Sequence, residues 1–170
     1  MPITTYIQNN LPADVWNYLV NDHKESTYPN VTQFFRKNKN GDFFYEGTVR
    51  AQIAHFIEVN LPMNEVSPAD WIVISEQPYP KLSNQRADIV IGNLTTVNPY
   101  DIIIEVKSDL NIESAKNDMG KMLDALDPNF QVGYMFFVSP PTAEVSAWVN
   151  QIEKSVGNPP YLHAIGISAG

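Results

Sequence analysis

The chain has 170 residues, of which 44% are hydrophobic and 18% are charged, with a formal net charge of -8 and no cysteine. This length fits a single domain over residues 1–170 that builds its core without disulfides or structural metal. The absence of thiols excludes disulfide frameworks, zinc–cysteine sites and cysteine nucleophiles. The N-terminus has no signal-peptide pattern, and no apolar run approaches the roughly 20 residues that a membrane helix needs. We therefore expect a soluble, cytoplasmic protein with no membrane partner.

The N-terminal part of the sequence predicts one helix followed by a polar segment. Residues 12–22 read as a helix, because Pro12 suits a first turn and apolar residues recur on one face. Residues 24–42 are polar and follow neither a helical nor a strand pattern. They hold the basic cluster of the chain, which consists of Arg36, Lys37 and Lys39.

A second helix is predicted over residues 43–60. Its apolar face consists of Val49, Ile53, Phe56 and Ile57. We expect Pro62 to end this helix, because a proline disfavours the helical conformation of the residue before it.

Buried strands dominate the remainder of the chain. Three strand-like runs cover residues 71–75, 87–91 and 101–107. A helix over 112–126, a strand over 131–139, a helix over 142–155 and a strand over 161–168 follow. Helices that alternate with buried strands predict an α/β fold, in which a central mixed β-sheet is flanked by helices on both faces.

Two acidic residues lie at positions that are unfavourable for an acid in the predicted helix or strand. Glu46 falls beside the apolar face of the second helix, where an ionised carboxylate is costly unless it is paired or bound to a cation. The macrodipole, which favours glutamate near a helix start, is the alternative explanation. Asp88 lies within the second strand, where aspartate is disfavoured. It either pairs with Arg86 or lines a site together with it.

A third acid lies in the next strand, within the sequence IIIEVK. Glu105 and Lys107 are two residues apart and therefore share one face. The opposite face consists of Ile102, Ile104 and Val106. A salt bridge within the strand would explain the charged pair, as would a site that both residues line.

The order of these residues indicates a metal site. Carboxylates from adjacent strands can converge on one divalent cation, since Mg²⁺ and Mn²⁺ take oxygen ligands. A lysine one step further along the same face can orient a water or stabilise charge that develops on a phosphate. Asp88, Glu105 and Lys107 thus supply the parts for metal-assisted phosphodiester hydrolysis.

These positions resemble the motif of the PD-(D/E)XK nuclease superfamily. Its restriction-endonuclease-like fold has an αβββαβ core, which matches the predicted elements over residues 43–138. The matching residues are Glu46, Asp88 in RADIVI, and Glu105-Val106-Lys107 in IIIEVKSD. One departure is Ala87, which stands where the name-giving motif has proline. The N-terminal helix and the last helix and strand lie outside the resemblance.

The resemblance implies a role for each matching residue. Asp88 and Glu105 would bind Mg²⁺ or Mn²⁺, with the backbone carbonyl of Val106 as a further ligand. Lys107 would be the catalytic lysine. Glu46 would support the metal or a water.

Basic residues are expected to contact the substrate around this site. Many relatives place a glutamine or lysine in the next helix, a position that Lys116 suits, whereas Lys121 is expected to point away. The other candidates are Arg36, Lys37, Lys39, Arg50, Lys81 and Arg86. With 19 acidic and 11 basic residues, the chain has little charge to neutralise a DNA backbone. A homodimer or a DNA-binding partner protein would concentrate that charge.

The function that we expect is a metal-dependent endonuclease that hydrolyses phosphodiester bonds of nucleic acid, with DNA as the favoured substrate. Restriction, repair, recombination and mobile-element biology are the settings in which such an enzyme works. One alternative is a catalytically inactive nuclease-fold subunit for binding or assembly, which the acidic charge favours. Another is an α/β domain whose charged strand residues form a structural cluster.

Overall fold

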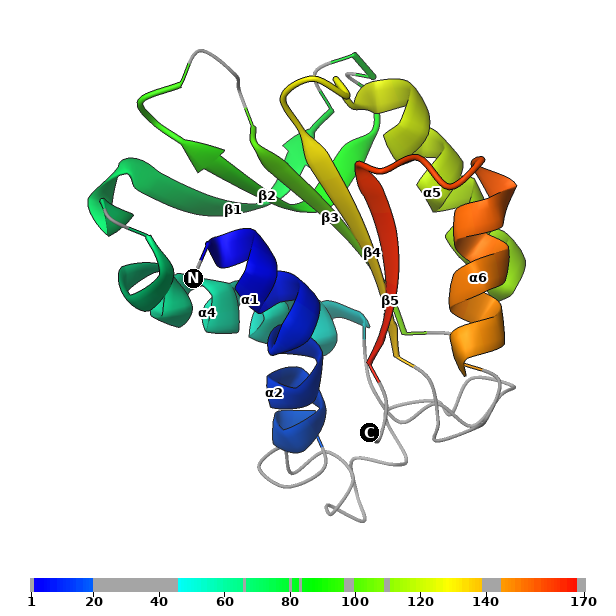
Figure 1. The fold of residues 1–170 in the computed structure, drawn as a ribbon, viewed down its shortest axis with the longest axis horizontal. Coiled ribbons are helices and arrows are strands. Elements are labelled where there is room, and N and C mark those ends of the chain that lie inside the picture. The colour runs from blue at the N-terminus through cyan, green and yellow to red at the C-terminus, as the bar shows by residue number, and fades with distance from the viewer. Residues whose placement is uncertain are drawn as a thin grey trace.

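The computed structural model of the chain describes residues 2–19, 46–65, 67–79, 81–82, 84–96, 100–108, 111–138 and 145–167. Within them, a five-stranded mixed sheet lies between two layers of helices, so the predicted α/β architecture is confirmed (Figure 1). The strands are β1 (Trp71–Pro78), β2 (Arg86–Asn93), β3 (Ile102–Lys107), β4 (Val132–Val138) and β5 (Leu162–Ile167). The helices are α1 (Ile3–Asn9), α2 (Leu11–Asn17), α4 (Glu46–Asn64), α5 (Ile112–Ala125) and α6 (Val145–Ser155), with a short 3-10 helix η3 (Pro68–Asp70).

The strands follow one another across the sheet in the order β1-β2-β3-β4-β5. The pairs β1–β2 and β2–β3 are antiparallel, whereas β3–β4 and β4–β5 are parallel. Parallel neighbours need crossover connections, which α5 and α6 provide. Both crossovers lead to the next strand in the same direction across the sheet, from β3 to β4 and from β4 to β5. Because crossovers between parallel strands are right-handed, both helices lie on one face of the sheet. Helices α1, α2 and α4 cover the other face (Figure 1).

Strand β3 is buried on both faces because it lies in the middle of the sheet. Ile104 and Val106 pack in the core beneath α1, α2 and α4, whereas Ile103 packs in the core beneath α5 and α6. This alternation is the one that the sequence predicts for IIIEVK. It places Glu105 and Lys107 on the side of α5.

The N-terminal region differs from the expected single helix over residues 12–22. Two short helices, α1 and α2, occupy it, and Pro12 lies in the first turn of α2 as expected. Helix α1 was not predicted, because its seven residues are short and partly β-branched and give a weak local signal. Tertiary packing stabilises it instead, since Ile3 and Ile7 are buried in the core.

The prediction that Pro62 ends the second helix is wrong, because α4 continues through it to Asn64. Proline has the backbone angle of a helix, although it removes one hydrogen bond of the preceding turn and its ring crowds the carbonyl four residues earlier. The amide of Glu65 donates to the carbonyl of Leu61 at 2.9 Å and so continues the helical pattern. The Glu65 side chain then accepts a hydrogen bond of 2.8 Å from the amide of Ile3 at the start of α1.

The C-terminal elements agree with their predicted positions within a few residues. In α5 the side chain of Asn111 caps the first turn by accepting a 3.1 Å hydrogen bond from the amide of Ser114. The predicted basic cluster of Arg36, Lys37 and Lys39 lies outside the described residues. Among the helices that the structure describes, none combines the length and the apolarity needed to cross a membrane.

Candidate active site

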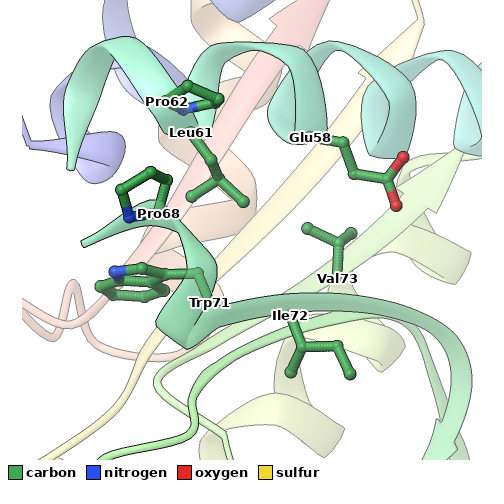
Figure 2. Close-up of a pocket in the computed structure, with 7 residues that line it drawn as sticks. All are labelled: Glu58, Leu61, Pro62, Pro68, Trp71, Ile72 and Val73. Carbon is green, nitrogen blue, oxygen red and sulfur yellow. The ribbon is translucent and has the colours of Figure 1, made fainter. Parts of the chain in front are cut away.

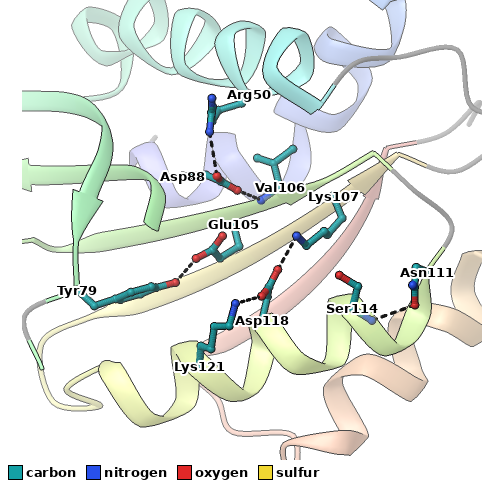
Figure 3. A network of polar contacts seen from close by, with 10 residues as sticks. All are labelled: Arg50, Tyr79, Asp88, Glu105, Val106, Lys107, Asn111, Ser114, Asp118 and Lys121. Carbon is teal, nitrogen blue, oxygen red and sulfur yellow. Dashed lines mark hydrogen bonds and ion pairs between the residues drawn. The ribbon is translucent and has the colours of Figure 1, made fainter. Parts of the chain in front are cut away.

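The candidate site lies where β2 and β3 separate (Figure 3). The ladder between these strands consists of the pairs Ile91–Ile102, Val90–Ile103 and Ile89–Ile104. If the ladder continued by one more pair, Asp88 on β2 would face Glu105 on β3. There the amide of Val106 donates a 2.8 Å hydrogen bond to Oδ2 of Asp88 instead of to the β2 backbone. The Asp88 side chain therefore takes the place of a backbone partner between the two strands.

The second oxygen of Asp88 binds Arg50, which reaches down from α4 (Figure 3). Arg50 Nη1 lies 3.1 Å from Asp88 Oδ1 and 3.1 Å from Glu76 Oε1 on β1. The ion pair between Asp88 and Arg86 that the strand pattern allowed is thus replaced by one with Arg50. Arg86 donates instead to the carbonyl of Glu76, at 3.3 Å.

Strand β1 is irregular beside Asp88. Its pairs with β2 include Ser75–Ile89 and Gln77–Ala87 but skip Glu76, whose φ is 55°. A positive φ is uncommon for a residue other than glycine and is often found near functional sites. Ala87 packs on the side of α5, although simple alternation would place it with Ile89 on the side of α4.

Glu105 is almost completely buried, with 6% of its surface exposed. The hydroxyl of Tyr79, in the connection after β1, donates a hydrogen bond to its Oε1. The pKa of Glu105 is raised to about 9, chiefly by burial and then by the charge and hydrogen bond of Asp88, whereas the Tyr79 hydrogen bond acts to lower it. The carboxyl groups of Asp88 and Glu105, from adjacent strands, therefore lie near enough for Asp88 to affect the pKa of Glu105.

Lys107 extends from β3 toward α5. Its Nζ lies 2.7 Å from Oδ2 of Asp118, whose other oxygen binds Lys121 (Figure 3). Burial lowers the pKa of Lys107, but the hydrogen bond and charge of Asp118, followed by the charges of Glu46 and Asp88, raise it on balance. Lys107 is therefore an ammonium at neutral pH.

Glu46 is the first residue of α4 and is half-buried. Its charge acts on Lys107, as does the charge of Asp88. The structure thus brings Glu46, Asp88, Glu105 and Lys107 into one region where β2 and β3 separate, between the start of α4 and α5. Asp101 lies apart from it, at the start of β3, where its carboxylate accepts a 2.6 Å hydrogen bond from the amide of Asn93.

The basic residues expected near the substrate have different positions. Arg50 lies in the site, whereas Arg86 is exposed on the β1–β2 side. Lys116 is paired with Glu113, 2.9 Å away along α5. Lys121, which was expected to point away, instead contacts Asp118.

Sequence reasoning missed Tyr79, Glu76 and Asp118. Asp118 had a recognisable signal, because it is a carboxylate within the apolar stripe that α5 forms with Ala115 and Met122. Tyr79 gave none, since it lies between two prolines in a stretch that reads as a turn. The contact between Glu76 and Arg50 depends on tertiary structure alone.

Two hollows on the surface are separate from this site. One, of about 290 Å³, lies between the end of α4, η3 and β1 (Figure 2). Its lining consists of Glu58, Leu61, Pro62, Pro68, Trp71, Ile72 and Val73. The other, of about 310 Å³, shares Trp71 with it and reaches Phe130 after α5. Neither contains the acids at the β2–β3 separation.

Chemically, the centre of the site combines the carboxyl groups of Asp88 and Glu105 with one ammonium and one guanidinium, and further carboxylates, those of Glu46, Glu76 and Asp118, surround them. No group of three or more His, Asp or Glu side chains among the described residues is arranged to hold a metal ion. The pair of Asp88 and Glu105 still offers oxygen donors, the type that Mg²⁺ and Mn²⁺ prefer. Comparison of the chain with protein-family models, curated proteins and solved structures finds no match.

Proposed function

We propose that the chain is a metal-dependent endonuclease that hydrolyses phosphodiester bonds of DNA. The observation that carries this proposal is the proximity of Asp88 and Glu105 where β2 and β3 separate, with Lys107 one step further along the same face of β3. The order α4-β1-β2-β3-α5-β4 supports a restriction-endonuclease-like core and membership of the PD-(D/E)XK superfamily.

Mg²⁺ or Mn²⁺ suits this pair of carboxyl groups, and Glu105, whose pKa is about 9, would release its proton on binding the ion. Mg²⁺ is usually bound through one or two protein carboxylates and completes its shell with waters and substrate phosphates, so two acids are a sufficient protein contribution. Asp88 and Glu105 would hold the ion, with the Val106 carbonyl as a further ligand. When bound, the cation supplies Lewis acidity toward a water and a phosphate oxygen.

The basic side chains provide the remaining chemistry. The Lys107 ammonium lies beside the carboxylate pair, where it stabilises negative charge that develops on the phosphate. Arg50 has a planar guanidinium suited to phosphate and can exchange its contact with Asp88 for one with the substrate. Glu46 acts on Lys107 through its charge and helps to keep it protonated.

The acidic chain must bind DNA through a local positive surface. Arg50 and Arg86 supply positive charge near the site, and Lys116 supplies a further cation on α5. With a net charge of -8, we expect weak binding that falls steeply with salt. A homodimer or a DNA-binding partner protein would strengthen it.

The test is incubation of the purified protein with supercoiled plasmid and Mg²⁺ or Mn²⁺. We expect cleavage by the wild type and a rate at least about 10²-fold lower in Lys107→Met, because a charge-stabilising group is lost. Asp88→Asn should also abolish cleavage. Asp124→Asn, on the exposed side of α5, is the matched control and should cleave at the wild-type rate. Absence of cleavage in the wild type, or equal cleavage by all variants, would refute the proposal.

A second candidate is the non-catalytic subunit with the same fold. One observation favours it: protein groups alone already bind the acids, since Arg50 and Val106 bind Asp88 and Tyr79 binds Glu105. Calorimetric titration with Mn²⁺ separates the two candidates. Binding that disappears in Glu105→Gln supports the enzyme, whereas a wild type that binds no Mn²⁺ supports the subunit.

A further inference from the structure

Asp118 is a buried acid in the apolar stripe of α5, with 5% of its surface exposed. Its neighbours on that face of the helix, Ala115 and Met122, belong to the core beneath α5 and α6. A carboxylate in such a place is costly unless it is paired. Asp118 is paired twice, because its two oxygens bind the ammonium groups of Lys107 and Lys121 (Figure 3).

The two ion pairs of Asp118 differ in what they connect. Lys121 lies three residues further along the same helix and has 45% of its side chain exposed. It compensates the charge of Asp118 without joining separate elements. Lys107 belongs to β3 and has 19% of its side chain exposed, so its 2.7 Å contact joins the helix to the strand that carries Glu105. Lys121 already compensates the charge of Asp118, so charge compensation does not explain why Asp118 also binds Lys107.

We infer that Asp118 is a positioning residue, which holds the Lys107 ammonium beside the pair of Asp88 and Glu105. This inference rests on the proposed function. A free lysine side chain is long and flexible, and a group that must act on a phosphate works best when its geometry is fixed beforehand. Helix α5 provides a rigid support for Asp118, because Asn111 caps its first turn and its apolar face is packed in the core.

Nuclear magnetic resonance of protein labelled with ¹⁵N-lysine tests the contact without metal or substrate. An ammonium held in an ion pair exchanges slowly with water, so we expect a signal from Lys107, assigned through its loss in Lys107→Arg. The signal should disappear in Asp118→Asn and persist in the matched control Asp124→Asn. A Lys107 signal unchanged in Asp118→Asn would overturn the inference.

Kinetics test the consequence of the contact. In Asp118→Asn we expect kcat to fall on the order of 10²-fold while KM changes little, because a positioned group moves. Asp118→Glu should restore part of the rate. In the background of Lys107→Met, Asp118→Asn should have no further effect, since Asp118 acts through Lys107. Additive losses in the double variant would contradict this role.

The measurements separate this inference from the proposed function. A wild type that does not cleave DNA refutes the function, and the resonance signal alone then decides whether Asp118 orders Lys107. Unfolding in urea shows whether Asp118→Asn folds. If that variant does not fold, Asp118→Leu, which suits the apolar stripe of α5, replaces it in the resonance measurement with the same expected loss of the Lys107 signal.

Discussion

The amide of Val106 donates a 2.8 Å hydrogen bond to Oδ2 of Asp88, directly after the last paired residues of β2 and β3. This bond gives Asp88 a structural role besides its proposed role as a ligand. In Asp88→Ala the buried Val106 amide loses its acceptor and the Arg50 guanidinium keeps Glu76 as its partner, so we expect the free energy of unfolding to fall by about 1–3 kcal/mol. Asp88→Asn keeps one acceptor oxygen and should lose less.

Urea unfolding of the two Asp88 variants measures this difference, with the exposed Asp124→Ala as the control. Equal losses in the alanine and asparagine variants would show that the hydrogen bond does not stabilise the strand separation. For functional assays Asp88→Asn is the better variant, because it removes the charge and preserves the backbone contact.

Arg50 binds the same carboxylate that we assign to the metal, so the two cations compete. Removing the guanidinium in Arg50→Met should strengthen Mn²⁺ binding by about two- to fivefold, the value of a partly exposed ion pair. DNA cleavage should fall nevertheless, because the guanidinium no longer reaches the phosphate. Calorimetry and plasmid cleavage measure the two effects separately. Weaker Mn²⁺ binding in Arg50→Met would show that Arg50 supports the carboxylates rather than competing for them.

Two buried tyrosines in the core beneath α1, α2 and α4 allow a prediction of how the stability of the fold depends on alkaline pH. Burial raises the pKa of Tyr134 to about 12, and burial together with the hydrogen bond to Asp14 raises the pKa of Tyr6 above its ordinary value of 10.0. Below pH 10 both phenols are neutral in the folded and in the unfolded protein, so the two tyrosines contribute fully to stability there. It is lost as the pH rises through the folded pKa values, by up to about 1.4 kcal/mol per pH unit for each group.

Urea unfolding between pH 8 and pH 12 tests this alkaline dependence. We expect Tyr134→Phe to flatten the decline, because phenylalanine fills the same buried space without a proton to lose. A slope identical to that of the wild type would contradict the assignment of the decline to Tyr134.

Substitution of two glycines by alanine should change the stability of the fold in opposite directions. A Cβ at Gly133 in β4 would lie 2.6 Å from Leu162 Cδ2 and 2.8 Å from Leu126 Cδ1, so Gly133→Ala should destabilise the fold by about 1–3 kcal/mol. A Cβ at Gly120 in α5 meets nothing within 4 Å. Gly120→Ala should therefore stabilise the helix by about 0.5–1 kcal/mol. Urea unfolding of both variants checks the signs, and a stabilised Gly133→Ala would show that the leucines can move aside.

The periodic patterns of the sequence predicted the sheet and its flanking helices, because β3 and β4 are apolar enough to require burial on both faces. They failed for α1, whose helical signal is weak and whose stability comes from packing. They failed at Pro62, where α4 continues for two more residues and ends at Asn64.

For the site, spacing along two strands was enough to select Asp88, Glu105 and Lys107. Their partners could not be predicted, since Arg50, Tyr79 and Asp118 come from elements that are far away in the sequence. Only Asp118 could have been identified from the sequence, because it is an acid within the apolar stripe of α5. Of the two alternatives for Asp88, the ion pair with Arg86 does not form, because a guanidinium from α4 binds the carboxylate and a pattern within one strand does not reveal that contact.

Tyr79 offers a test of the carboxylate pair that leaves both acids in place. Its hydroxyl donates to Glu105, and its ring is buried in the core beneath α5. Partners of metal ligands orient them, and their loss typically weakens metal binding about 10- to 100-fold. We therefore expect Tyr79→Phe to weaken Mn²⁺ binding by that factor. Tyr134→Phe is a matched control, because Tyr134 is equally buried on the opposite face of the sheet. Calorimetry that finds the same Mn²⁺ affinity in both variants would show that Glu105 needs no orientation by Tyr79.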